Sequence, residues 1–149
     1  MPPVQLFFLL SALLVLPLAW VKGGHAERAA VALFIAAYVS GPFLQGYQIG
    51  EVMAAVALGD LAVWSVFVWL ALRYDRWWLI LASAAQGLNV LSHAAIVLTP
   101  DITTREAVAA QWIFGLVSLY ALLSGVLERH LAGEQAAGPP LYRMPATQT

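Results

Sequence analysis

The residues whose chemistry stands out most from their surroundings are polar side chains inside long apolar stretches. Asp60 lies near the middle of the apolar stretch 52–72. At such a depth in a membrane a carboxylate costs about 2.5 to 3.5 kcal/mol on insertion scales. We expect this side chain to face protein or water, and to be largely neutral unless a donor or a cation pairs with it. Asp60 is therefore the first candidate for binding a proton or a ligand.

A second set of polar residues shares one face of the next apolar stretch, 77–98. Spacings of three, three and four place four side chains along one stripe of a helix: Ser83, Gln86, Asn89 and His93. Only the residues 73–76 separate the two stretches, so two helices must run side by side there. We therefore expect one intramembrane cluster made of Asp60, Gln86, Asn89 and His93.

Three interpretations of this cluster stay open. In the first, side-chain hydrogen bonds only hold the two helices together, at about 0.6 kcal/mol each. In the second, Asp60 and His93 accept a proton or orient a ligand in a cavity open to the outer face. In the third, a residue of a partner protein completes the cluster.

The sequence lacks the residue sets that several enzyme classes need. There is no cysteine, which excludes thiolate nucleophiles, zinc–thiolate sites and iron–sulfur clusters. Intramembrane aspartyl proteolysis needs two carboxylates, whereas Asp60 is the only one away from the ends of the apolar stretches. The chain also has no HExxH sequence and no glycine-rich phosphate loop. We therefore expect no metal, no cofactor and no enzymatic activity.

The elements that must position these residues are five long apolar stretches. Of 149 residues, 62% are apolar and only 10% are charged, which is too few charges to cover a water-soluble domain of this size. About 20 residues of helix cross the hydrocarbon of a membrane, and backbone groups within lipid must be satisfied inside helices. The predicted spans are 4–21, 27–45, 52–72, 77–98 and 107–127.

These spans predict an all-α fold, a polytopic membrane protein built as a five-helix up-down bundle. The bundle occupies residues 1–128, because the breaks between spans are short and neighbouring helices must be antiparallel. From residue 129 to 149 the chain becomes polar and proline-bearing, which is typical of a flexible tail.

The distribution of basic residues supports five spans and gives their orientation. One side of the membrane collects Lys22, Arg28, Arg73, Arg76, Arg129 and Arg143, while the other side has only Arg105. Basic residues gather on the cytoplasmic side of membrane proteins, so we expect the N-terminus outside and the C-terminal tail in the cytoplasm. The first stretch lacks the basic start and the small-residue cleavage site of a signal peptide, so we expect it to be retained as a span.

A short basic and aromatic segment marks the predicted cytoplasmic ends of the third and fourth spans. We call it the inner-face collar, and its members are Arg73, Asp75, Arg76, Trp77 and Trp78. Such residues typically anchor a span against lipid headgroups. A docking site for a cytoplasmic partner is the alternative.

Small residues spaced four apart indicate close packing between helices rather than dimerisation. They occur in three spans, as Ala32, Ala36 and Ser40, as Ser83 and Gly87, and as Ala121 and Gly125.

The segment from Asp60 to His93 resembles small multi-pass inner-membrane proteins of bacteria. The likeness is carried by the mid-span acid, by the collar sequence from Arg73 to Trp78, and by Gln86 and His93. It implies the bacterial plasma membrane as the location and transfers no catalytic or binding residue. In size and helix count the chain is also similar to the translocator-protein family, but that family's Pro- and Trp-bearing loop signatures are absent, so nothing is carried over from it.

The expected function is that of an accessory, assembly or interaction subunit of a larger membrane complex, since the short loops leave little room for a soluble catalytic site. The alternative is a small transporter or binding protein for a proton, a quinone or a lipid-like ligand, using Asp60, Asn89 and His93. The expected partners are the lipid bilayer and either other membrane subunits or further copies of the chain. A net charge of −1 provides no basic surface for nucleic acid.

Overall fold

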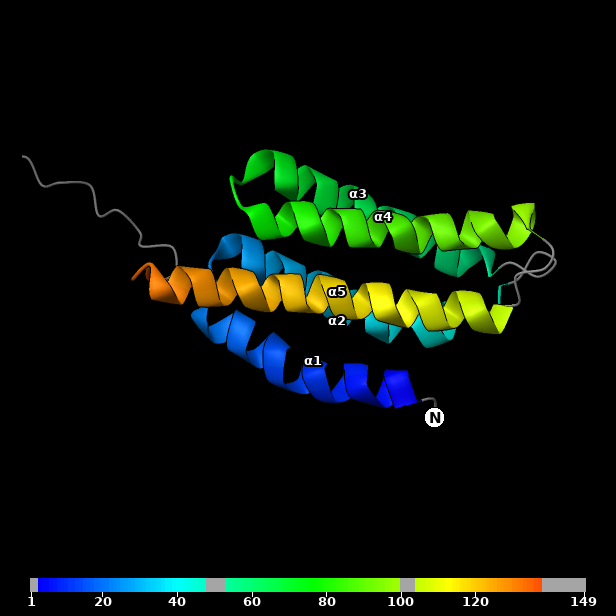
Figure 1. The fold of residues 1–149 in the computed structure, drawn as a ribbon, viewed down its shortest axis with the longest axis horizontal. Coiled ribbons are helices and arrows are strands. Elements are labelled where there is room, and N and C mark those ends of the chain that lie inside the picture. Colours follow the sequence, from blue (N-terminus) through cyan, green and yellow to red (C-terminus); the bar gives the residue numbers. More distant parts are fainter. Residues whose placement is uncertain (1–2, 48–52, 100–103, 138–149) are drawn as a thin grey trace, which may run out of the picture.

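Five helices account for most of the described chain (Figure 1). The computed structural model describes residues 3–47, 53–99 and 104–137. Its helices are α1 (Pro3–Lys22), α2 (His25–Leu44), α3 (Ala54–Arg73), α4 (Trp77–Leu98) and α5 (Thr104–Leu131). All five are long and apolar enough to cross a membrane. The predicted fold class, an all-α polytopic membrane protein with a five-helix up-down bundle, is confirmed.

The helices match the predicted spans to within a few residues. α4 has the predicted bounds, and α1 is one residue longer at each end. α2 begins at His25, two residues earlier than predicted, and α3 ends at Arg73, one residue later. α5 is longer than predicted at both ends, so the first three residues of the predicted tail are helical. Residues 132–137 of that tail are not helical, and residues 138–149 lie outside the described residues.

Two glycines allow the short turn between α1 and α2. Gly23 N–H donates to the carbonyl of Ala19 (2.9 Å) at the end of α1. Gly24 N–H donates to Glu27 Oε2 (2.8 Å) in the first turn of α2. A Cβ on Gly23 would lie 2.3 Å from the Ala19 oxygen, which no side chain tolerates. The two helices are therefore close antiparallel neighbours.

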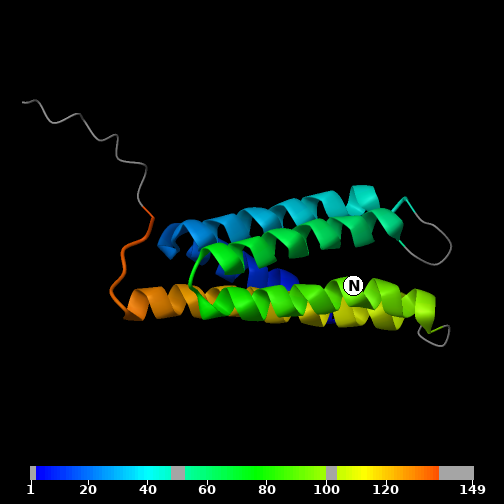
Figure 2. The same ribbon diagram turned by 90° about the horizontal axis from the view of Figure 1, so that it is seen from above.

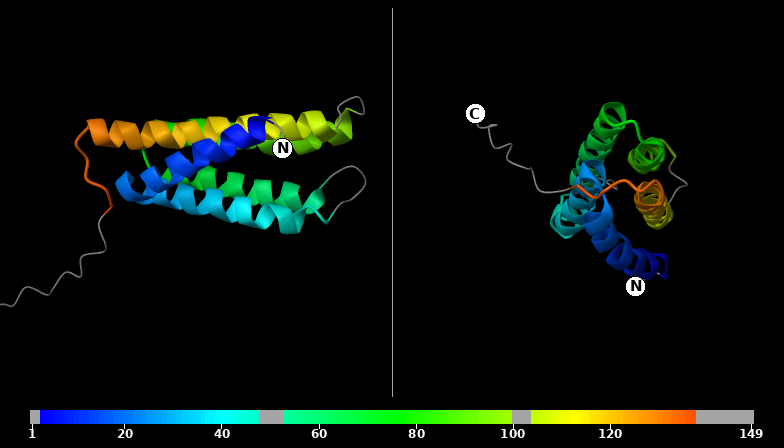
Figure 3. Two further views of the ribbon diagram at one scale, coloured as in Figure 1. Left: turned by 90° about the horizontal axis from the view of Figure 1, so that it is seen from below. Right: turned by 90° about the vertical axis from the view of Figure 1, so that its left-hand side faces the viewer.

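Seen end-on, the helices form a ring in which each packs against two neighbours (Figure 3). The order around the ring is α1, α5, α4, α3 and α2, and α2 also touches α5 across it. α1 and α5 are thus neighbours although they stand at opposite ends of the chain. The α3–α4 and α4–α5 hairpins bring α4 between α3 and α5, so side chains of three helices meet on α4.

Most of the apolar core lies in one half of the bundle. We call that half's end the basic end; it holds the α1–α2 turn, the α3–α4 turn and the C-terminus of α5 (Figure 2). The largest fully buried apolar side chains belong to this half: Trp78, Phe67, Leu70, Leu79, Leu119 and Leu122. Trp78 lies so close to Gly125 that a Cβ there would be 2.3 Å from Trp78 Cδ1.

The small-residue pairs have two different environments. Gly125 faces Trp78 of α4, and a Cβ on Gly87 would lie 3.1 Å from Trp64 Nε1 of α3. These two glycines therefore mark close helix contacts, as predicted. Ala32 and Ala36, in contrast, are exposed on α2.

Candidate functional site

The intramembrane acid and the intramembrane histidine are in direct contact. His93 Nε2 of α4 lies 2.9 Å from Asp60 Oδ2 of α3. The His93 side chain is 5% exposed and that of Asp60 is 17% exposed. The short α3–α4 connection favours this contact, because it makes the two helices antiparallel neighbours. The two residues lie in the half of the bundle away from the basic end.

Two further side chains extend this contact onto α5. Gln111 Nε2 donates to Ser92 Oγ (2.9 Å) and lies 3.2 Å from His93 Nε2. Ser92 Oγ in turn donates to the carbonyl oxygen of Asn89 (2.7 Å). We call Asp60, His93, Gln111 and Ser92 the polar network. It joins three helices around one buried imidazole.

Gln111 is the member that the sequence analysis missed. In an antiparallel hairpin, residues equally far from the turn lie at the same level, and His93 and Gln111 are almost symmetric about the turn between α4 and α5. Gln111 is an amide side chain within the apolar stretch 107–127, at about the level of His93. These two features of the sequence could therefore have indicated that it joins the network.

Gln86 and Asn89 are buried on the same stripe of α4, at 6% and 8% exposure. Neither side chain has a hydrogen bond to Asp60 or His93 among the residues that the structure describes. Asn89 Oδ1 and His93 Nδ1 are both buried without a hydrogen-bond partner. The structure thus brings together Asp60 and His93 of the four predicted cluster residues. It leaves Nδ1 of His93 itself and Oδ1 of the nearby Asn89 without a hydrogen-bond partner.

An apolar groove of about 600 Å³ adjoins the polar network on the seam between α4 and α5. It is lined by Leu88, Leu91, Ser92, Ala95, Glu106, Ala107, Ala110 and Phe114. The α5 lining residues Ala107 and Phe114 share a helix face with Gln111. Ser92 belongs both to the groove wall and to the polar network. The groove therefore ends, on its inner side, at hydrogen-bonding groups.

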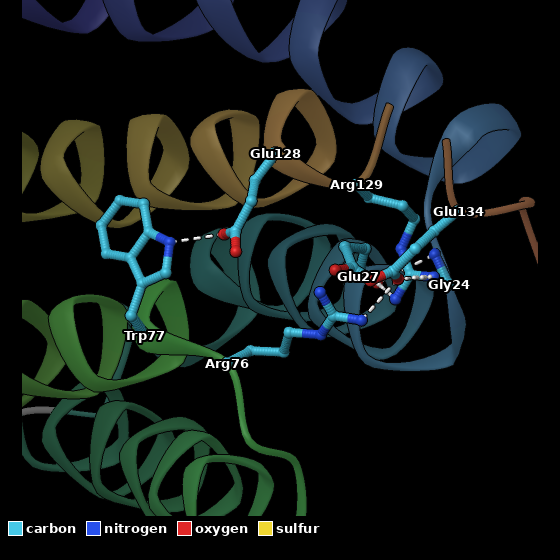
Figure 4. Close-up of polar contacts among 7 residues, drawn as sticks. All are labelled: Gly24, Glu27, Arg76, Trp77, Glu128, Arg129 and Glu134. Atoms are coloured by element: carbon cyan, nitrogen blue, oxygen red, sulfur yellow. Dashed lines mark hydrogen bonds and ion pairs between the residues drawn. The ribbon is translucent and has the colours of Figure 1, made fainter. Parts of the chain in front are cut away.

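A second cluster closes the basic end (Figure 4). We call Glu27, Arg76, Arg129 and Glu134 the basic-end cluster. Glu27 is fully buried, and Arg129 Nη2 lies 3.5 Å from Glu27 Oε2. Glu134 Oε2 receives Arg129 Nη1 at 2.9 Å and Arg76 Nη2 at 2.5 Å. Three separate parts of the chain are tied together by these charges.

The residues after α5 cross the basic end and reach the turn between α1 and α2. We call residues 132–137 the C-terminal strap (Figure 2). Its Glu134 belongs to the basic-end cluster, and Ala137 N–H donates to the carbonyl of Gly23 (3.1 Å). This arrangement was not predicted from the sequence, in which its one indication is Glu27, a carboxylate at the start of the predicted span 27–45.

The inner-face collar divides into exposed and buried members. Arg73 and Asp75 are exposed, and the Arg73 guanidinium lies 5.9 Å from the ring centroid of Tyr74. Trp77 is half exposed and its indole N–H donates to Glu128 (Figure 4). Trp78 is fully buried, which differs from the expectation that it anchors the chain at the headgroups. Trp77 and Trp78 point in different directions because adjacent helix residues are about 100° apart.

The strap is expected to remain attached near neutral pH and to detach only in acid. The hydrogen bond from Arg76 lowers the pKa of Glu134 below its ordinary value, and the same bond raises the pKa of Arg76. A carboxyl with a lowered pKa contributes stability above its unfolded value, about 4.5, and loses it as the pH falls through the folded value. A spin label on a Gln135→Cys variant should therefore stay immobile from pH 7 to 5 and become mobile only below about 4.5.

Glu134→Gln is the matched control, since its label should be mobile at every pH. Mobility that already rises between pH 7 and 5 in the otherwise unaltered strap would contradict the assignment of the attachment to Glu134.

These features define a polytopic five-helix membrane protein with a polar network in one half of its bundle. Within the described ranges, no three His, Asp or Glu side chains lie close enough to hold a metal ion. No family model matches the chain, and neither does any curated protein or solved structure. The resemblance to small bacterial inner-membrane proteins stays a prediction.

Proposed function

We propose that the protein is a membrane-embedded binding protein or small transporter for a lipid-like ligand. The observation that carries this proposal is the double role of Ser92, which lines the apolar groove and belongs to the polar network. An apolar surface that ends at a few fixed polar groups is the usual composition of a small-molecule site. The groove volume of about 600 Å³ lies within the range of about 300–1,000 Å³ typical of ligand pockets.

In this proposal the two parts of the ligand have separate contacts. Its apolar part lies against the α4–α5 seam, and its polar part approaches Ser92 and Gln111. Asp60 and His93 lie directly behind them, joined by the contact between Gln111 Nε2 and His93 Nε2. Ionisable side chains at membrane depth usually serve a transport path, a proton relay or a ligand. Asp60 is the more exposed member of the pair, at 17%, so in this proposal a proton reaches the pair through Asp60.

The proposed location is the plasma membrane of a bacterium, with the basic end at the cytoplasm and the N-terminus outside. The asymmetry of basic residues in the sequence supports this orientation. Lys22, Arg73 and Arg129 belong to the basic end, whereas Arg105 lies at the other end, in the first turn of α5. The ligand groove, which includes Glu106, then opens toward the outer half of the membrane.

Filling the groove is expected to remove the ligand. Ala110→Trp places an indole in the α4–α5 groove, whereas Ala109→Trp, on the exposed neighbouring position outside the lining, leaves the groove open. Native mass spectrometry of protein purified in mild detergent should detect a bound small molecule on the unaltered chain and on Ala109→Trp. The bound fraction should fall about tenfold or more in Ala110→Trp, with an unchanged unfolding midpoint.

An unaltered chain that carries no small molecule contradicts the proposal. So does an Ala110→Trp variant that keeps its ligand, because the groove would then not be the site.

The accessory-subunit function predicted from the sequence is the second candidate. It is favoured by the low burial of α3, whose apolar window is only 11% buried. Its large exposed side chains are Leu58, Leu61, Val66, Trp69 and Leu72. The same native mass measurement separates the two candidates, because this function requires other subunits that co-purify in fixed ratio.

A further inference from the structure

Two arginine side chains of the basic-end cluster donate to a single oxygen atom (Figure 4). Arg76 Nη2 lies 2.5 Å from Glu134 Oε2, and Arg129 Nη1 lies 2.9 Å from the same atom. Arg76 directly precedes α4 and Arg129 lies in the last turn of α5, and these two helices are neighbours. The position between the arginines is open to solvent, because the side chains of Arg76 and Glu134 are 24% and 37% exposed.

The described helices by themselves leave one positive charge of these two arginines without an ion-pair partner. Within the described residues, Glu27 of α2 is the only helical carboxylate that pairs with either arginine, and it contacts Arg129 alone. Glu128 is next to Arg129 in the chain but accepts the Trp77 N–H. The second negative charge comes from Glu134, which follows the end of α5. The helices therefore form a site for one anion, and a carboxylate of the same chain occupies it.

Arg129 is held in place by contacts that do not involve the strap. Its Nη2 lies 3.5 Å from Oε2 of the buried Glu27, and a Cβ on Gly24 would lie 2.6 Å from the same nitrogen. The guanidinium group thus packs against the turn between α1 and α2. The backbone of Glu134 is fixed beside it, since its N–H donates to the carbonyl of Arg129 (3.0 Å). Rotation of the Glu134 side chain toward solvent is therefore enough to vacate the site.

The basic end is where the spans meet the membrane surface. Trp20, near the end of α1, and Trp77, at the start of α4, are 52% and 50% exposed there, which is typical of tryptophan at the level of the headgroups. The anion at this depth is the phosphate group of an anionic phospholipid. Guanidinium groups bind phosphate through charge-assisted hydrogen bonds, and basic pockets between membrane helices bind lipid headgroups.

We propose that Arg76 and Arg129 form a binding site for the phosphate group of an anionic phospholipid, and that Glu134 competes with this lipid for the same nitrogen atoms. The lipid binds when the Glu134 side chain turns away, and the carboxylate returns when the lipid leaves. This site lies at the opposite end of the bundle from Glu106 and the α4–α5 groove. It therefore goes beyond the proposed function and does not depend on it.

Native mass spectrometry of the full chain in mild detergent measures this binding, with dioctanoyl phosphatidylglycerol as the probe. Dioctanoyl phosphatidylcholine, in which a choline cation balances the phosphate, is the matched probe. Glu134→Ala removes the competing carboxylate and leaves α5 intact, because this residue follows the helix. We expect Glu134→Ala to bind phosphatidylglycerol about tenfold more tightly than the unaltered chain does, which equals about 1.4 kcal/mol. Binding of phosphatidylcholine should stay weak in both.

Three further variants separate this site from a general attraction of anionic lipid to a basic surface. Asp75→Ala removes the same charge from the same end, but Asp75 is exposed and pairs with neither arginine, so binding should change by less than about twofold. Adding Arg76→Gln to Glu134→Ala should abolish the gain. Adding Arg73→Gln should preserve it, since Arg73 is exposed and contacts the Tyr74 ring.

Equal binding of phosphatidylglycerol to the unaltered chain and to Glu134→Ala overturns the proposal. So does a gain that Asp75→Ala reproduces or that survives Arg76→Gln. An unaltered chain that binds no phosphatidylglycerol also contradicts it, because Glu134 would then be a permanent partner of the two arginines. Inorganic phosphate is the last probe. Its failure to displace the lipid supports a headgroup site, whereas displacement would assign the site to a soluble anion and overturn the assignment to lipid.

Discussion

Replacement of Arg129 by leucine is expected to lower the free energy of unfolding by about 3–5 kcal/mol, the range measured when one partner of a buried ion pair is removed. Glu27 is fully buried and receives Arg129 Nη2 at 3.5 Å. Without this guanidinium its carboxylate keeps only the Gly24 N–H at 2.8 Å, and Glu134 loses one of its two arginines. Unfolding in mixed dodecyl sulfate micelles, followed by circular dichroism, measures the loss.

The double variant Glu27→Gln with Arg129→Leu should recover at least half of that loss. The amide oxygen of glutamine still accepts from Gly24 N–H, and no buried charge is left without a partner. Arg73→Leu is the surface control and should change stability by less than about 1 kcal/mol, since Arg73 is exposed and contacts the Tyr74 ring. A double variant as unstable as Arg129→Leu would show that lost packing, rather than the uncompensated charge of Glu27, causes the effect.

Gly125→Ala is expected to destabilise the bundle by about 1–3 kcal/mol, although alanine is the better helix former. The new Cβ would lie 2.3 Å from Cδ1 and 2.5 Å from Nε1 of Trp78. Trp78 is fully buried, so α4 and α5 must move apart or the indole must leave its position. The unfolding midpoint measures the loss, and a change in tryptophan fluorescence should accompany it.

Gly41→Ala is the matched control, because nothing lies within 4 Å of a Cβ at that position of α2. Pro42 follows directly, and a proline disfavours the helical conformation of a preceding residue that has a Cβ, which offsets the helix-forming gain of alanine. Stability should therefore change by less than about 1 kcal/mol in either direction. Combining Gly125→Ala with Trp78→Phe should restore part of the loss, since a smaller ring makes room for the methyl group. Equal effects at the two glycines would contradict the contact with Trp78.

The five helices could be predicted from the sequence because a span needs a long apolar run and each run is bounded by charges or helix breakers. The contact between Asp60 and His93 followed from the short connection between two spans, which fixes their relative height. Helix spacing also correctly put Gln86 and Asn89 on the buried stripe. It could not determine their hydrogen bonds, which depend on helix rotation and rotamers that sequence spacing does not specify.

Other contacts could not be predicted because they join residues far apart in the chain. Glu27 meets Arg129 and Arg76 meets Glu134, and no local pattern connects those pairs. The aromatic composition of the segment predicts that Trp77 and Trp78 both lie at the membrane interface. Interface composition does not reveal which of two adjacent helical residues faces inward, and this is why the burial of Trp78 was missed.

The place of α1 beside α5 has a consequence for how the chain matures. Each helix emerges from the ribosome in turn, so α1 enters the membrane long before its main neighbour has been synthesised. A nascent chain that ends before α5 leaves uncovered the faces of α1 and α4 that pack against α5. It also lacks Arg129 and Glu134, which close the cytoplasmic end of the bundle in the proposed orientation. The bundle therefore cannot be completed until α5 has been inserted. In a prematurely terminated chain the helices stay unassembled, and cellular quality control is expected to degrade it.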